Sequence, residues 1–162
     1  MKVMTKILFA LVLALPVLTA CKKDEANAEK VVVKVDAPTT DDDNAWATYI
    51  QSVVQQNVEG VEGAPFVYFL PASAAKDAGM KERLLIEAQN AVARGVIPGN
   101  MLVFASPDSK AISGMAVNAL GFAEPGAMKG SQVMFIGKSG DEVAVKAAAD
   151  KAGANFKFVE VK

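Results

Sequence analysis

The sequence predicts an α/β fold, a compact three-layer domain built on a mostly parallel sheet of about four strands. Two observations lead to this fold class. Short apolar runs alternate along the chain with longer amphipathic stretches. The runs at residues 66–70, 101–105 and 133–136 are almost entirely apolar, which is typical of parallel strands that are buried on both faces. Right-handed crossovers between such strands would place the amphipathic stretches as helices against the sheet.

The first twenty residues are predicted to be a secretory signal peptide. Lys2 and Lys6 provide a positive start, and residues 7–18 form an apolar run that only Pro16 interrupts. Such a run is too short and wrongly flanked for a membrane-spanning helix. We therefore expect residues 1–20 to be removed and to take no part in the fold.

The end of this segment, Leu18-Thr19-Ala20-Cys21, resembles the lipobox of bacterial lipoproteins. The resemblance implies that Cys21 becomes the acylated first residue of the mature protein and that its partner is a lipid membrane. Lys22 in the next position resembles lipoproteins that are exported to the outer membrane and face the periplasm, where envelope proteins are further candidate partners. The alternative for Cys21 is an ordinary secretory cleavage site that leaves a free thiol.

Residues 21–43 are predicted to be the lipidated N-terminus and a flexible linker, because their charged and Pro/Thr/Asp-rich parts offer little apolar surface to bury. The run Val31–Val35 has two interpretations, a short edge strand or part of the tether, and we favour the tether. The acidic run 41–43 lacks the glycine and glutamate of a calcium-binding loop. We expect Asp43 or Asn44 to cap the helix that follows.

The domain is expected to span residues 44–162, and it begins with a helix, a strand and a second helix. Apolar side chains at helical spacing predict the first helix over residues 45–58. The continuous apolar run at residues 66–70 predicts a buried strand. The second helix is predicted from an apolar stripe that ends before Gly95 and consists of Met80, Leu84, Leu85, Ala88, Ala91 and Val92.

Three more strands complete the predicted sheet. Residues 101–105 and 133–136 are short apolar runs of the kind that occupy the middle of a parallel sheet. Residues 156–161 alternate less cleanly between apolar and charged side chains, which indicates an edge strand.

Each of these two apolar runs is followed by a predicted helix with its own start signal. Ser106 is expected to cap the first of these helices, with Pro107 at its first position. Ser139 and Glu142 match the capping-box pattern for the second helix, which Gly153 would end. Alternation of strand and helix is thus maintained to the end of the chain.

Composition excludes several classes of function. The chain contains no histidine and one cysteine, so it cannot use Ser-His-Asp or Cys-His catalysis, a Cys/His zinc site or a disulfide. We expect no metal and no cofactor. Lys2 and Lys6 would leave with the signal peptide, so the mature chain carries 15 basic against 18 acidic residues, a net charge of −3. This balance does not favour nucleic acid as a partner.

Candidate ligand-binding residues lie where the predicted strands end. In parallel sheets, ligands bind beyond the carboxyl ends of the strands at a switch in strand order. Three polar loops should meet there, and two of them open helices whose free N–H groups can hold an anion. The candidates are Ser106, Ser109, Lys138 and Ser139. The alternative is that these residues only cap helices and shape turns.

The same loops also resemble the SxxK, SxN and KTG elements of penicillin-binding proteins and serine β-lactamases. The matching residues are Ser73-Ala74-Ala75-Lys76, Ser106-Pro107-Asp108 and Lys138-Ser139-Gly140. The resemblance implies a Ser/Lys hydrolase that needs no histidine. The chain departs from it at Asp108 and Ser139, where the family has asparagine and threonine. The domain is also small for that fold.

Together these observations predict a membrane-anchored lipoprotein of the bacterial envelope, whose domain is a non-enzymatic binding or structural module. The alternative is a small-ligand or anion-binding protein, or a weak Ser/Lys-type hydrolase, that uses the loops at the strand ends.

Overall fold

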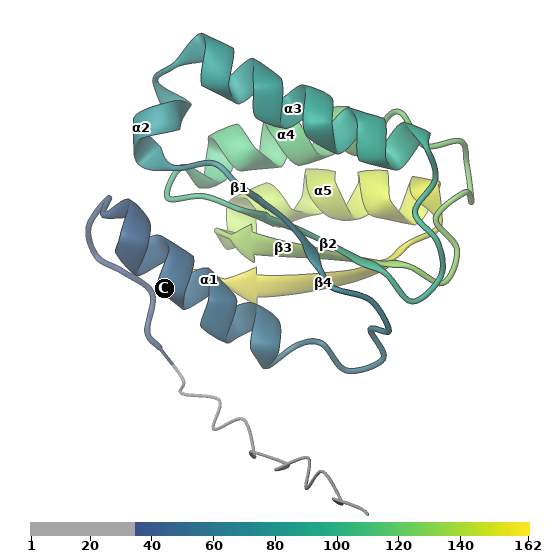
Figure 1. The fold of residues 1–162 in the computed structure, drawn as a ribbon, viewed down its shortest axis with the longest axis horizontal. Helices are drawn as coiled ribbons and strands as arrows, with labels where there is room; N and C mark the ends of the chain where they lie inside the picture. Colours follow the sequence, from purple (N-terminus) through teal and green to yellow (C-terminus); the bar gives the residue numbers. More distant parts are fainter. Residues whose placement is uncertain (1–34) are drawn as a thin grey trace, which may run out of the picture. The chain divides into compact units, whose positions relative to one another are not determined.

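The described residues form a sheet of four strands in the order β1-β2-β3-β4, and all neighbouring strands are parallel. A computed structural model describes residues 35–162 (Figure 1), all within the second of two units, Met1–Lys30 and Val31–Lys162. The predicted signal peptide and Cys21 lie outside the described residues. The strands are β1 (Phe66–Phe69), β2 (Met101–Ala105), β3 (Gln132–Gly137) and β4 (Asn155–Glu160).

Helices cover both faces of the sheet, so the predicted three-layer α/β fold is confirmed (Figure 1). Three helices that connect successive strands pack on one face: α3 (Ala78–Ala93), α4 (Ser109–Leu120) and α5 (Ser139–Ala152). The other face is covered by α1 (Asp43–Gln55). A single-turn helix, α2 (Ala72–Ala75), follows β1 and was not expected from the sequence.

The core consists of two apolar clusters, one on each face of the sheet, because side chains alternate along each strand. In β2, Leu102 and Phe104 join the cluster under α3, α4 and α5, whereas Met101 and Val103 face α1. Burying each large side chain of this kind contributes about 1.5–3 kcal/mol. Both central strands are buried along the whole of their apolar runs, as predicted.

The strand at residues 66–70 was predicted to be buried, and this prediction is wrong. β1 is an edge strand that pairs only with β2 within the described part of the chain, and Phe66 and Val67 are 48% and 45% exposed. A continuous apolar run resembles a central strand, but its place in the sheet depends on where the later strands add. Within residues 35–162, the predicted edge strand near residues 156–161 is confirmed as β4.

Three predicted helix caps are corrected by the structure. The caps of α1 and α4 are Asp42 and Asp108, whose carboxylates accept from backbone N–H groups three residues ahead, at 2.7 and 3.0 Å. α5 begins after Lys138 without a side-chain cap, so the capping box at Ser139 is not formed. Each helix starts within one to three residues of the predicted position. In α1 and α4 this small offset gives the capping role to another residue.

Residues 35–42, which we assigned to the linker, lie against the domain. Val35 and Ala37 pack against the cluster under α1, and the Trp46 indole Nε1–H donates to the Thr40 carbonyl at 2.9 Å. The predicted boundary at residue 44 therefore falls inside chain that contacts the core. Residues 31–34 of the valine run lie outside the described residues, and Val35 itself is in no strand.

Candidate functional site

The loops that follow β1, β2 and β3 meet at the carboxyl ends of the strands, as the sequence predicts. They surround a hollow of about 430 Å³. Its lining comes from all three loops and from the segment before α1, and consists of Asp41, Ala72, Ala75, Lys76, Pro107, Asp108, Ser109, Lys110, Lys138 and Asp141. A second hollow of about 240 Å³ shares Asp41, Pro107, Ser109 and Lys138 with the first.

Ser106 holds the end of β1 against the loop after β2. Its hydroxyl donates to the Leu70 carbonyl at 2.7 Å and accepts from the backbone N–H of Asp108 at 3.0 Å. The side chain is buried and lines the second hollow. Because its donor and one acceptor site are used within the fold, Ser106 shapes the loop and lacks a free proton to offer a ligand.

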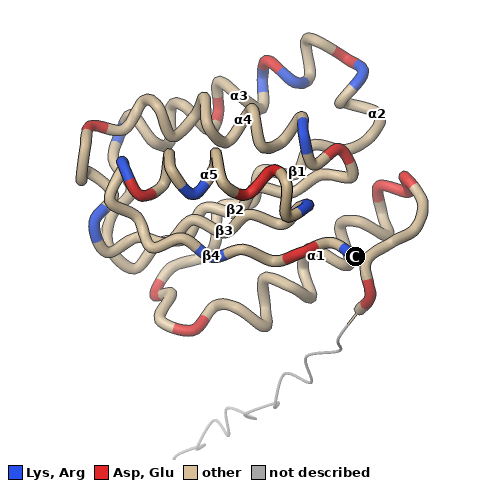
Figure 2. Tube along the Cα trace, turned by 180° about the vertical axis from the view of Figure 1, so that it is seen from behind, with Lys and Arg blue, Asp and Glu red and all other residues tan. Residues whose placement is uncertain are grey.

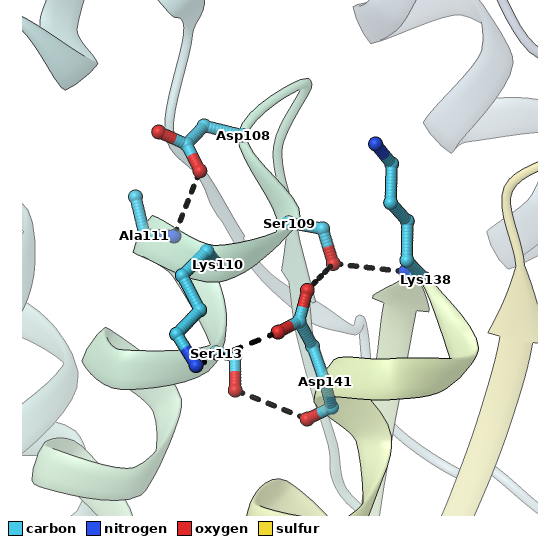
Figure 3. A network of polar contacts seen from close by, with 7 residues as sticks. All are labelled: Asp108, Ser109, Lys110, Ala111, Ser113, Lys138 and Asp141. Carbon is cyan, nitrogen blue, oxygen red and sulfur yellow. Dashed lines mark hydrogen bonds and ion pairs between the residues drawn. The ribbon is translucent and has the colours of Figure 1, made fainter.

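Ser109 is the centre of a polar network that joins α4 to α5 (Figure 3). Its hydroxyl donates to the Asp141 Oδ2 at 2.7 Å and accepts from the backbone N–H of Lys138 at 2.8 Å. Ser113, one turn further along α4, donates to the Asp141 carbonyl at 3.1 Å. The two helices are therefore fastened to each other at their N-terminal ends.

The lack of a side chain at Gly137 leaves room for this network. A Cβ atom on Gly137 would lie 2.7 Å from the Ser109 Oγ and 2.5 Å from the ring of Phe135. Real Cβ atoms do not come so near. Glycine at the end of β3 thus lets the Ser109 hydroxyl sit where it can reach both Asp141 and the Lys138 backbone.

Three lysines line the larger hollow, and all are exposed. The Lys110 ammonium lies 3.9 Å from the Asp141 Oδ1, but its side chain is 89% exposed, so this ion pair is weak. The Lys138 side chain extends away from Ser109 and Asp141 (Figure 3). Lys76 comes from the turn after α2.

Positive and negative groups balance in this hollow. Three aspartates, Asp41, Asp108 and Asp141, face the three lysines in its lining. The first turns of α4 and α5 are already supplied with carboxylates, since Asp108 caps α4 and Asp141 lies in the first turn of α5. Across the described domain basic and acidic positions are likewise interspersed (Figure 2). The field at the site therefore does not strongly select an anion.

The structure brings together three of the four predicted site residues. Ser106, Ser109 and Lys138 line the second hollow, and Ser109 and Lys138 also line the first. Ser139 is the exposed first residue of α5 and is not among the lining residues of either hollow. The expected switch in strand order is absent from the described sheet, whose order is sequential.

The sequence does not single out Asp141 as a site residue, because Ser139 and Glu142 on either side of it fit a capping box. The Asp141 carboxylate is only 15% exposed and is held by a serine 32 positions earlier in the chain. The available signal was an acidic residue in the first turn of a helix next to the predicted site. That signal is also typical of ordinary helix starts.

A serine beside a carboxylate is not sufficient for nucleophilic catalysis. A carboxylate is a much weaker base than the imidazole or amine that usually activates a serine, and Ser109 is itself buried. Ser73, the serine of the SxxK resemblance, is exposed on α2 and donates to the Asp43 Oδ2 at 3.0 Å. Its hydroxyl thus faces a carboxylate, whereas the resemblance requires a lysine amine.

No family model, curated protein or solved structure matches this chain. Among residues 35–162, no group of three His, Cys, Asp or Glu side chains is placed to hold a metal ion. The helices of this described part are also too short or too polar to cross a membrane.

Proposed function

We propose that this chain is a lipid-anchored protein of the bacterial cell envelope, attached through Cys21, whose α/β domain is a non-enzymatic binding or structural module. The observation that carries the proposal is Leu18-Thr19-Ala20-Cys21 directly after the apolar run at residues 7–18. Acylation with more than one chain would give the durable attachment that a single chain does not provide.

Palmitate labelling of the chain in a bacterial host tests the anchor. The wild-type chain is expected to incorporate label and to fractionate with membranes, whereas Cys21→Ala is expected to lose both properties. Thr19→Ala, at the variable position of the lipobox, is the matched control and should label like the wild type. Labelling of the Cys21→Ala variant would refute the proposal.

The destination within the envelope depends on the residue after Cys21. Lys22 supports an outer-membrane location facing the periplasm, and Lys22→Asp is expected to shift the protein to the inner membrane. Fractionation against markers of the two membranes measures this. Recovery of the wild-type chain with the inner membrane would remove the outer-membrane assignment without affecting the lipid anchor.

A non-enzymatic role is supported by the chemistry at the strand ends. The chain has no histidine, the Ser109 hydroxyl donates to Asp141, and the Ser73 hydroxyl donates to Asp43. We expect a fluorophosphonate probe to leave the serines of this domain unlabelled. Labelling that Ser73→Ala abolishes would instead favour the Ser/Lys hydrolase.

Binding of a small anion remains the second candidate, and the three lysines around the larger hollow are the observation in its favour. Thermal unfolding in increasing phosphate, at constant ionic strength, separates the two candidates. Our proposal predicts no saturable rise in the melting temperature. A saturable rise that Lys138→Ala removes and Lys157→Ala retains would favour anion binding, because Lys157 is an exposed lysine on β4 away from the lining of this hollow.

A further inference from the structure

The outer edge of β1 carries backbone groups that the described sheet does not use (Figure 1). The Leu70 N–H donates to the Ala105 carbonyl at the end of β2 at 3.0 Å, so it points into the sheet. The N–H and C=O groups of successive residues in a strand point to opposite sides. Those of Val67 and Phe69 therefore point away from β2, toward the open side of β1.

The two outer strands of the described sheet are protected unequally against further pairing. Natural sheets discourage such pairing with charged side chains at the edge, lysine above all. β4 contains Lys157 and Glu160, whereas β1 is the uncharged sequence Phe66-Val67-Tyr68-Phe69. Phe66 and Val67 are also exposed. The edge formed by β1 is thus the one that lacks the usual protection.

An apolar hollow of about 240 Å³ lies beside the β1 edge, between β1 and α1. Val67 and Phe69 form one side of it, and Ile50, Gln51 and Val54 of α1 form another. None of the described residues that line this hollow is charged. An apolar patch that is continuous with a free strand edge is typical of a surface that binds another protein segment.

The charge of the domain favours this surface over others for contact between two copies of the chain. Residues 35–162 contain 11 basic and 15 acidic residues, a net charge of −4. Two copies therefore repel each other overall. The β1 edge and the apolar hollow let them meet without placing like charges opposite each other.

β1 is also complementary to itself when two copies pair in antiparallel fashion. A two-fold axis at Tyr68 places Val67 of each copy opposite Phe69 of the other, and both residues direct their backbone groups outward. Residues opposed in this way exchange both of their N–H···O bonds. Their side chains lie on the same face of the joined sheet, and pairs of aromatic and β-branched side chains are favourable there. The same axis puts the two α1 helices on one face, so the two apolar hollows adjoin.

We propose that two copies of this chain pair through β1, which joins their described sheets into one continuous sheet across a two-fold axis. The contact is closed, because the same patch is used on both copies and no further copy can add to it. A four-residue strand and a small hollow form a limited interface, so the dimer is weak and depends on concentration. The proposal does not depend on acylation of Cys21.

Sedimentation and amide hydrogen exchange of the full chain in nonionic detergent, from about 5 µM to about 500 µM, test this dimer. The mass is expected to rise from that of one chain toward that of two. Over the same range the N–H groups of Val67 and Phe69 should come to exchange at least about threefold more slowly. The Phe158 N–H is the internal reference and should not change. It points away from β3, because the Val161 N–H donates to the Gly137 carbonyl and the direction alternates along β4.

Val67→Lys is expected to abolish both effects, because it places two ammonium groups at the joined edge. Val143→Lys is the matched control, since Val143 is a more exposed valine on α5, and it should leave the dimer intact. Two chains that merely share a detergent micelle would respond equally to both variants. Gln51→Lys, on the exposed side of α1 that lines the apolar hollow, should also weaken the dimer without altering the strand.

Three outcomes would overturn the proposal. The chain could remain a monomer at the highest concentration, or its dimer could survive both Val67→Lys and Gln51→Lys, which would assign the contact to another surface. Slow exchange of Val67 and Phe69 that persists unchanged in the monomer would mean that a segment of the same chain covers β1.

Discussion

At the scale of single residues, one hydroxyl group determines how the helices meet at the carboxyl end of the sheet. Ser109 donates to the Asp141 carboxylate and accepts from the Lys138 backbone, so it satisfies two groups of α5 from a position on α4. Polar groups that are shielded from water are costly when they lose their partners. Ser109, a predicted ligand-binding residue, thus connects α4 to α5.

Ser109→Ala is expected to lower the free energy of unfolding by about 1–3 kcal/mol, because it removes a donor from the shielded Asp141 carboxylate and an acceptor from the Lys138 N–H. Urea denaturation followed by circular dichroism measures the change. Ser139→Ala, at the exposed first position of α5, should stay within about 0.5 kcal/mol of the wild type. Equal stabilities of the two variants would contradict this role of Ser109.

We expect ionisation of the two tyrosines to lower the stability of the domain at alkaline pH. Burial raises the pKa of Tyr49 above its ordinary value of 10.0. Burial also raises the pKa of Tyr68, with a further increase from the Glu87 carboxylate that Arg94 partly offsets. Because the folded state keeps its phenol protons longer than the unfolded chain does, the stability is complete below the unfolded pKa and is lost as pH rises through the folded one.

We therefore expect the melting temperature of the wild type to fall above about pH 10. A variant with both Tyr49→Phe and Tyr68→Phe should fall less steeply, since the chain has no other tyrosine. Lysine titration contributes equally to both proteins and is removed by the comparison. Identical pH profiles between pH 8 and 11 would show that phenol ionisation is not linked to unfolding.

At the scale of helices and strands, the sequence predicts whether a segment is a helix or a strand better than it predicts which elements lie beside that segment. The runs in β2 and β3 were correctly predicted as buried strands because a strand with partners on both sides and helices on both faces needs only apolar side chains. The equally apolar run of β1 does not indicate that, in the described part of the chain, β1 has a neighbouring strand on one side only. Edge position is a property of the assembled sheet.

The same limit applies to the candidate site. The convergence of the three loops was predictable, because parallel strands end at one edge of the sheet. The contact between Ser109 and Asp141 was not, since the two residues are 32 positions apart and neither belongs to a distinctive motif. Caps were misassigned for a related reason: several Ser and Asp residues near each helix start can fill the position.

The cap of α1 provides a test at this scale. Asp42→Ala is expected to lower the free energy of unfolding by about 1 kcal/mol, because the Asp42 carboxylate accepts from the Ala45 N–H at 2.7 Å. Asp41→Ala removes the same charge one residue earlier and is the matched control, with a smaller expected effect. Thermal or urea unfolding gives both values. A larger loss for Asp41→Ala would reassign the cap.

At the scale of the whole domain, the two faces of the sheet are covered unequally. α3, α4 and α5 share one face, whereas α1 and the segment before it are the described elements on the other. Val35 and Ala37 contribute to that second cluster, and Thr40 provides the acceptor for the indole of Trp46. Residues 35–42 therefore help α1 to shield the sheet from water.

A pair of shortened chains tests this contribution. A chain that starts at Val35 is expected to unfold cooperatively, and one that starts at Asn44 is expected to be less stable by more than the Asp42→Ala change, because it loses the cap, the two apolar contacts and the Thr40 acceptor together. Trp46 is the only tryptophan, so its fluorescence reports directly on this face. The shorter chain should show red-shifted emission in its folded state, as its indole becomes hydrated. Equal stability and equal emission of the two chains would mean that residues 35–42 only follow the surface and that the domain is complete from residue 44.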